Sequence, residues 1–172
     1  VVFLLATSNL LMPLVAFGSQ HTIIKFYSSY NNNDERDSFM SSVIFIPLLT
    51  ILPITFLVIK FHDLIGNFLS IQNPIIESYV WIIFLVAFAT SYFEVFYSWA
   101  RVQLKSVFGN FLKEIFPRLS IFSLLVCVYL NVITKEDFVW WLTGFYYVRL
   151  IIMMIYSFSL YMPKIKFSLP SN

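Results

Sequence analysis

The sequence predicts an all-α membrane protein, a bundle of five membrane-spanning helices, and three observations predict it. Of the 172 residues, 59% are hydrophobic and only 12% are charged, about half the charged share of an ordinary soluble domain. The mean hydropathy is +0.81, which indicates that most of the chain lies in the hydrocarbon interior of a lipid bilayer. Five segments have the roughly 20 apolar residues that a helix needs to cross a bilayer. None of them alternates polar and apolar residues as the strands of a membrane barrel do.

Charge and composition exclude several classes of protein. A net charge of +2 is too small for a nucleic-acid binder, which normally has a basic stripe. The single cysteine, Cys127, excludes an intramolecular disulfide and any multi-cysteine metal site, and its apolar surroundings indicate a packing or lipid-facing residue. No Ser–His–Asp set, glycine-rich phosphate loop or metal-ligand spacing is present. We therefore expect no catalytic residues, metal or cofactor, and the chain is not predicted to be an enzyme.

The first predicted span covers residues 1–20 and contains no charge. Because the chain starts with an apolar run and has no basic leader, we interpret it as a fragment of a longer membrane protein. The second span, residues 39–59, contains Pro47 and Pro53, which membrane helices tolerate and which mark kinks. The polar run between these spans carries Asp34 and Asp37. That spacing suits Mg²⁺, but with no second acidic motif we interpret it as a solvated turn.

The remaining spans are predicted at residues 79–100, 111–132 and 138–161. The connector before them contains FHDLIGNFLSI, whose apolar residues recur at helical intervals and predict a short helix in the membrane interface. Thr134 and Asp137 have the spacing of a cap for the last span. The region 1–172 is treated as one helical unit without repeats.

The positions of lysine and arginine predict the orientation, because cytoplasmic loops hold the excess of these residues. Two cations, Lys60 and Lys135, lie in the connectors assigned to the outside. Eight lie in the segments assigned to the cytoplasm, which are the loop at 20–38, the junction at 101–118 and the C-terminal tail: Lys25, Arg36, Arg101, Lys105, Lys113, Arg118, Lys164 and Lys166. The predicted location is the cell membrane.

The third span carries a polar stripe, whose members recur at steps of three and four residues and so share one helical face. They are Thr90, Ser91, Glu94, Tyr97, Ser98, Arg101 and Lys105. Because charges in hydrocarbon cost several kcal/mol, the stripe must face protein or water. Two interpretations stay open: the stripe is a contact between helices, or it lines a hydrophilic cavity.

Arg149 lies about 11 residues from each end of the last span, roughly 17 Å from either end of the helix. A guanidinium at that depth needs an anion. One interpretation is a structural pair with Glu94, and the other is direct binding of a phosphate-bearing ligand, which the planar guanidinium suits.

Two stretches resemble a known family. AFGSQHTIIKFYSSY, with Gly18 followed by Lys25-Phe26, is similar to the end of the second membrane helix in oligosaccharide flippases, the polysaccharide-biosynthesis (Wzx-like) branch of the MATE-related exporters. LKSVFGNFLKEIFPRL is similar to the junction between that family's fourth and fifth helices. The matching residues there are Lys105, Ser106, Asn110, Phe111, Leu112, Glu114 and Arg118.

The resemblance implies that the chain covers about helices two to six, as part of one lobe of a larger two-lobe transporter with an alternating central cavity. It also implies a lipid-diphosphate-linked oligosaccharide as substrate, membrane lipids as surroundings and polysaccharide-assembly proteins as partners. On this hypothesis Lys25, Arg101 and Lys105 attract the diphosphate, while Glu94 and Arg149 line the route. Two alternatives remain: a drug/cation antiporter of the same superfamily, with Glu94 as ion carrier, and a membrane enzyme of glycan assembly.

Overall fold

The computed structural model describes residues 1–30, 32–70 and 78–164, and all regular structure in these ranges is helical. The all-helical prediction is therefore confirmed. The elements, in chain order, are α1 (Val2–Ala16), α2 (Ser19–Phe26), η1 (Tyr27–Ser29), α3 (Asn33–Lys60), α4 (His62–Ser70), α5 (Val80–Val102), α6 (Ser106–Asn110), η3 (Phe111–Ile115), α7 (Phe116–Tyr129) and α8 (Lys135–Leu160).

Three of these helices, α3, α5 and α8, are long and apolar enough to cross a membrane. They correspond to the spans predicted at 39–59, 79–100 and 138–161. A fourth candidate exists if α1 and the helical segment after it count as one broken span. By length and composition, then, the described part of the chain has three or four helices suited to a membrane.

The first predicted span is not one straight helix. Helix α1 ends at Ala16, and the next helical segment, Ser19–Ser29, is bent by 56° from it. The two residues at the break, Phe17 and Gly18, have left-handed backbone conformations with φ of 48° and 72°. Glycine adopts this conformation without a steric penalty, so Gly18 is the residue that permits the bend.

The segment predicted to begin a span at residue 111 is already helical from Ser106, and helix runs unbroken to Tyr129. The junction predicted at 101–118 is thus mostly helix. Within it, η3 is a π turn, in which the N–H of Phe116 donates to the carbonyl of Phe111. The physical reason is Pro117, which has no N–H to donate to the carbonyl of Lys113 and whose ring crowds that carbonyl in a regular α-helix. A π turn just before the proline accommodates this mismatch.

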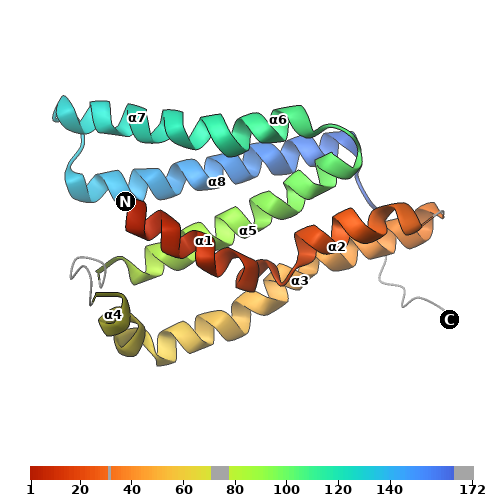
Figure 1. Cartoon of the computed structure of the whole chain (residues 1–172), viewed down its shortest axis with the longest axis horizontal. Helices are drawn as coiled ribbons and strands as arrows, with labels where there is room; N and C mark the ends of the chain where they lie inside the picture. Colours follow the sequence, from red (N-terminus) through yellow and green to blue (C-terminus); the bar gives the residue numbers. More distant parts are fainter. Residues whose placement is uncertain (31, 71–77, 165–172) are drawn as a thin grey trace.

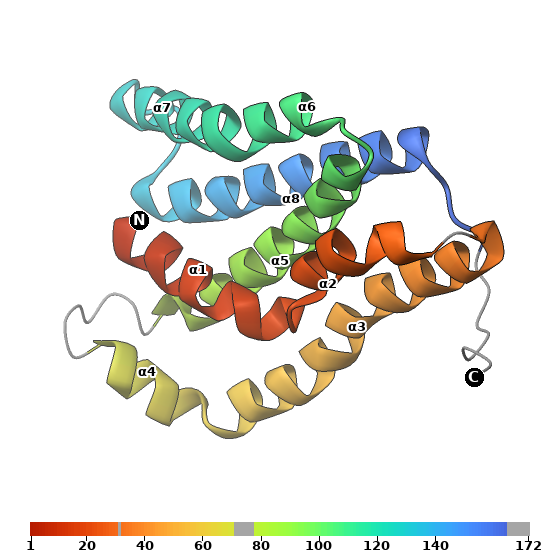
Figure 2. The ribbon, with the colours of Figure 1, turned by 45° about the vertical axis from the view of Figure 1, so that its right-hand side comes forward.

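Helix α5 lies at the centre of the bundle, with α1 and α2 on one side and α8 on another (Figures 1 and 2). In its most apolar stretch 72% of the residues are buried, against 17% in α3. Small hydroxyls join α5 to its neighbours: Ser8 donates to the Ile83 carbonyl at 3.0 Å and Ser157 to the Phe96 carbonyl at 2.8 Å. Such side chains let membrane helices approach closely while their polar atoms stay paired.

Helix α3 runs through both of its prolines for 28 residues. The Thr50 hydroxyl lies 2.7 Å from the carbonyl oxygen of Val15 in α1 and 3.0 Å from the carbonyl oxygen of Pro47 in its own helix. This contact ties the proline-containing part of α3 to α1. The Val15 carbonyl lies in the last turn of α1, where backbone carbonyls lack a partner within the helix.

Two local predictions are confirmed. The connector does form a short helix, α4, and Thr134 and Asp137 form a capping box at the start of α8. In that box the Asp137 N–H donates to the Thr134 hydroxyl oxygen, and the Asp137 carboxylate accepts from the Thr134 N–H.

The acidic run at Asp34–Asp37 is not a solvated turn. It forms the first turns of α3, which Asn32 caps by accepting from the Asp34 N–H. Asp37 is buried and accepts a hydrogen bond from the Tyr161 hydroxyl, which closes the end of α8 onto α3. No group of residues suited to a metal ion occurs in the described ranges.

The three segments predicted to be cytoplasmic meet at one end of the bundle. The α2–α3 turn, the α5–α6 turn and the end of α8 all lie there, while α4 and the α7–α8 turn lie at the opposite end (Figures 1 and 2). Of the eight cations counted in these segments, five belong to helices: Lys25, Arg36, Arg101, Lys113 and Arg118. Lys166 lies outside the described residues.

Candidate functional site

The candidate site is where α5, η3 and α8 meet, and its centre is an ion pair between Glu94 and Lys113. Their carboxylate oxygen and ammonium nitrogen are 2.7 Å apart, and the side chains are 13% and 39% exposed. Glu94 is eight residues from the end of α5, so the pair lies about 12 Å inside that end of the helix. The Lys113 ammonium from η3 therefore neutralises Glu94, the carboxylate of the polar stripe on α5.

The ring of Tyr97 lies between two cations beside this pair. The Lys113 ammonium is 5.3 Å and the Arg101 guanidinium 5.6 Å from the ring centroid, distances at which a cation is attracted to an aromatic face. The Tyr97 hydroxyl donates to the side-chain oxygen of Asn110 in α6. Gly109 makes this approach possible, because a Cβ there would lie 2.3 Å from the tyrosine ring. The tyrosine thus connects the exposed Arg101 with the inner ion pair.

Arg149 in α8 is only 5% exposed and lies between two aromatic rings. Its guanidinium is 4.1 Å from the centroid of Phe93 and 4.7 Å from that of Tyr146. Its Nε–H has no hydrogen-bond partner, and among the described residues no carboxylate lies within ion-pair distance of it. The Glu94–Arg149 pair, one of the two interpretations of this arginine, is not formed, and the guanidinium instead contacts two aromatic faces.

A small pocket borders Arg149 on the side of α7. Its lining includes Pro117 and Ser120 from α7 together with Tyr146, and it has no room for a water molecule. The arginine is therefore enclosed in this arrangement.

The charges of this cluster do not balance. One carboxylate, Glu94, faces two buried or half-buried cations, Lys113 and Arg149. An excess positive charge in a low-dielectric interior is costly, and an anion placed against it is correspondingly favoured. The cluster is therefore suited to binding an anion and poorly suited to binding a cation.

The other members of the polar stripe lie in contacts between helices. Thr90, Ser91, Tyr97 and Ser98 are all buried. The Ser91 hydroxyl lies 3.0 Å from the Met12 carbonyl of α1 and 2.7 Å from the Ala87 carbonyl of α5. In this arrangement the stripe serves helix packing on the α1 side and the charged cluster on the η3 and α8 side.

The three cations predicted to attract a diphosphate lie near one end of the bundle and are exposed. Arg101 lines a pocket of about 290 Å³ together with Tyr27 and Ser28 of η1. The Lys25 ammonium is 5.1 Å from the centroid of Phe26, and Lys105 precedes α6 as its N-cap. The three outer cations are thus exposed, whereas Arg149 is buried.

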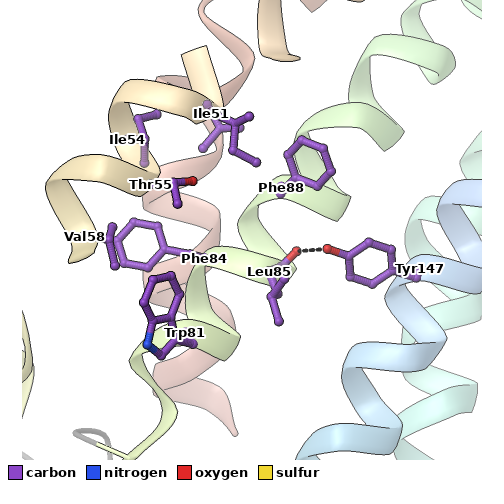
Figure 3. Close-up of a pocket in the computed structure, with 10 residues that line it drawn as sticks. Ile51, Ile54, Thr55, Val58, Trp81, Phe84, Leu85, Phe88 and Tyr147 are labelled. Carbon is purple, nitrogen blue, oxygen red and sulfur yellow. Dashed lines mark hydrogen bonds between the residues drawn. The ribbon is translucent and has the colours of Figure 1, made fainter. Parts of the chain in front are cut away.

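A second cavity, of about 270 Å³, lies over α5 between α3 and α8 (Figure 3). Trp81 and Phe84 of α5 face Val58 of α3 across it, and Tyr147 of α8 stands on the other side (Figure 3). The Tyr147 hydroxyl adds no free donor to the cavity, since it donates a hydrogen bond to the Leu85 carbonyl at 3.2 Å. This cavity is apolar and is suited to hydrocarbon.

Sequence reasoning did not assign Lys113, Asn110, Phe93 or Tyr146 to the site. Lys113 was counted as a cation of a cytoplasmic junction. Two signals point to it: Asn110 and Lys113 are three residues apart on one helical face, and Pro117 follows Lys113 by four residues, where it disturbs the helix.

Comparison of the chain with protein-family models, with curated proteins and with solved structures finds no match. The site's chemistry therefore carries the functional argument.

Proposed function

We propose that this protein is part of a membrane transporter that moves lipid-diphosphate-linked oligosaccharides across the membrane for surface polysaccharide assembly. The observation that carries the proposal is the enclosed guanidinium of Arg149, which lacks an anionic partner within a bundle of membrane-compatible helices. Guanidinium groups bind phosphate through two parallel hydrogen bonds, so a diphosphate headgroup suits this site. The resemblance of two stretches to oligosaccharide flippases agrees with this substrate class.

The ion pair of the site favours an anion over a cation as substrate. In a drug or cation antiporter Glu94 would have to be free to bind the cation. Here its carboxylate is 2.7 Å from the Lys113 ammonium, and Arg149 adds a second positive charge nearby. A cationic substrate would be repelled by this cluster.

On this proposal the cations at the predicted cytoplasmic end collect the headgroup, and Arg149 receives it deeper in the bundle. Arg101 is one of these outer cations, and the Tyr97 ring lies within 5.6 Å of its guanidinium and 5.3 Å of the Lys113 ammonium in the inner cluster. Because the pocket beside Arg149 is closed here, we take this arrangement as one state of an alternating cycle. The π turn η3 and Pro117 are where α7 can bend away from α8. Such rocking about a central site is common in transporters.

The test scores glycan export and protein abundance together in cells that depend on the transporter. Arg149→Ala should abolish export while the protein reaches the membrane in normal amounts, and Arg149→Lys should restore only part of the activity, because lysine keeps the charge but loses the planar fork. Arg118→Ala, which alters an exposed arginine, is the matched control and should export normally. Full export by an abundant Arg149→Ala protein would reject the substrate role.

A structural role predicts a different pattern. In that case Arg149→Ala lowers abundance and export in parallel. Combining it with Glu94→Ala tests whether the two charges depend on each other, since recovery of abundance in the double variant would assign Arg149 to a structural pair.

A further inference from the structure

We propose that Lys113 is a positioning residue, which holds the Glu94 carboxylate away from Arg149 and so keeps Arg149 able to bind the substrate's diphosphate. The inference rests on the proposed function for its ligand. It adds a residue that the transport hypothesis does not contain, and it assigns a task to the π turn.

The first argument is competition for one carboxylate. Glu94 follows Phe93, whose ring contacts the Arg149 guanidinium at 4.1 Å, and Glu94 is near enough to Arg149 to interact with it electrostatically. Without Lys113 the strongest remaining attraction for this carboxylate within the cluster is Arg149. A bidentate pair between the two would satisfy Arg149 and exclude a phosphate from it.

The second argument is the geometry that brings Lys113 to Glu94. Lys113 lies in the middle of η3, the π turn that precedes Pro117. A π turn holds an extra residue, so converting it into regular α-helix would rotate the residues on one side by about 100° around the helix axis relative to those on the other. The reach of Lys113 toward Glu94 thus depends on a local departure from regular helix.

The third argument is that the surroundings fix Lys113 without satisfying Arg149. The Tyr97 ring lies 5.3 Å from the Lys113 ammonium and is itself anchored through Asn110 of α6. Arg149 has aromatic rings on both faces and an unpaired Nε–H. In this arrangement Lys113 neutralises Glu94, and Arg149 remains able to bind a phosphate group.

The binding test uses the full chain in lipid nanodiscs, titrated in a calorimeter with inorganic diphosphate and, separately, with a short isoprenyl diphosphate. Lys113→Met should weaken diphosphate binding about tenfold or more, and Lys113→Met with Glu94→Gln should recover most of the loss, because the competing carboxylate is then neutral. Arg118→Met removes an exposed cation and should leave binding unchanged. A double variant that binds no better than Lys113→Met, in folded protein, would overturn the inference.

The second readout follows Arg149 directly and does not require substrate. In protein with ¹⁵N-labelled arginine, the Nε–H resonance of Arg149, assigned by its loss in Arg149→Lys, should shift downfield and exchange more slowly in Lys113→Met, because a bond to Glu94 has formed. Glu94→Gln in the same background should reverse both changes. An Nε–H signal identical in wild type and Lys113→Met would reject the role of Lys113.

The two proposals fail separately. Wild-type protein that binds neither diphosphate would reject the proposed substrate class, while the arginine resonance would still report whether Lys113 controls the partner of Glu94.

Discussion

The ammonium nitrogen of Lys113 lies 2.7 Å from a carboxylate oxygen of Glu94, and this ion pair joins the central helix α5 to the π turn η3. The carboxylate is largely enclosed and the ammonium partly so. A pair in that setting is sensitive to the loss of either partner, because the remaining charge is left in a poorly solvated place.

We expect Lys113→Met to lower the free energy of unfolding by about 1–3 kcal/mol, less than for a fully buried pair because the lysine side chain is 39% exposed and Arg149 can take over as the partner of Glu94. Lys113→Met with Glu94→Gln should recover part of this loss, because the side chain left behind is then neutral. Thermal unfolding in detergent measures both.

The control is the pair between Glu114 and Arg118, whose atoms are 3.4 Å apart and whose side chains are 59% and 80% exposed. Its disruption should cost less than about 1 kcal/mol. Equal losses for the two pairs would show that the inner pair does not stabilise α5 against η3.

The aromatic enclosure of Arg149 makes a second prediction. Phe93→Leu keeps an apolar side chain but removes the face against the guanidinium, and it should destabilise the protein by about 1–2 kcal/mol. Tyr146→Phe keeps its ring face and should have a much smaller effect. The comparison is again a thermal unfolding series, and a larger loss for Tyr146→Phe would contradict the cation–π assignment.

Gly109 makes a third prediction. A methyl group there would lie 2.3 and 2.7 Å from two atoms of the Tyr97 ring, so Gly109→Ala should cost about 1–3 kcal/mol by forcing α6 away from α5. Gly144 in α8 has no atom within 4 Å of such a methyl group, so Gly144→Ala should be neutral or stabilising by up to about 1 kcal/mol. Tyr97→Leu should reduce the penalty of Gly109→Ala. Unfolding temperatures that do not separate the two alanine variants would contradict this.

Topology makes the fourth prediction. In a Cys127→Ser background, cysteines at Glu35 and Lys105 should react with a membrane-impermeant maleimide only from the cytoplasmic side. Cysteines at Asp63 and Lys135 should react only from outside. The reason is the excess of lysine and arginine in the predicted cytoplasmic segments. The α2–α3 turn, the α5–α6 turn and the end of α8, which belong to these segments, lie at one end of the bundle (Figures 1 and 2). Labelling of Lys105→Cys and Asp63→Cys from the same side would refute the proposed orientation.

Much of the fold is determined by the sequence alone. Long, predominantly apolar runs predict helices at α3, α5 and α8, because the membrane interior offers backbone amides no hydrogen-bond partner and a helix pairs them internally. The cap at Thr134 and the short helix α4 follow from local spacing, and local interactions suffice to form them. The hydropathy pattern does not predict the break after Ala16, because the left-handed backbone conformations of Phe17 and Gly18 do not change the apolar character of the segment.

The site depended on tertiary structure. Spacing within α5 places Glu94 and Tyr97 on a polar face, but it says nothing of which helix meets that face. In the folded chain Glu94 pairs with Lys113, which lies in the π turn before Pro117. Arg149 was expected to need an anion, and instead two aromatic rings from α5 and α8 enclose it. Helical periodicity is a property of one chain segment, whereas the partner of a buried charge depends on how neighbouring helices are rotated against one another.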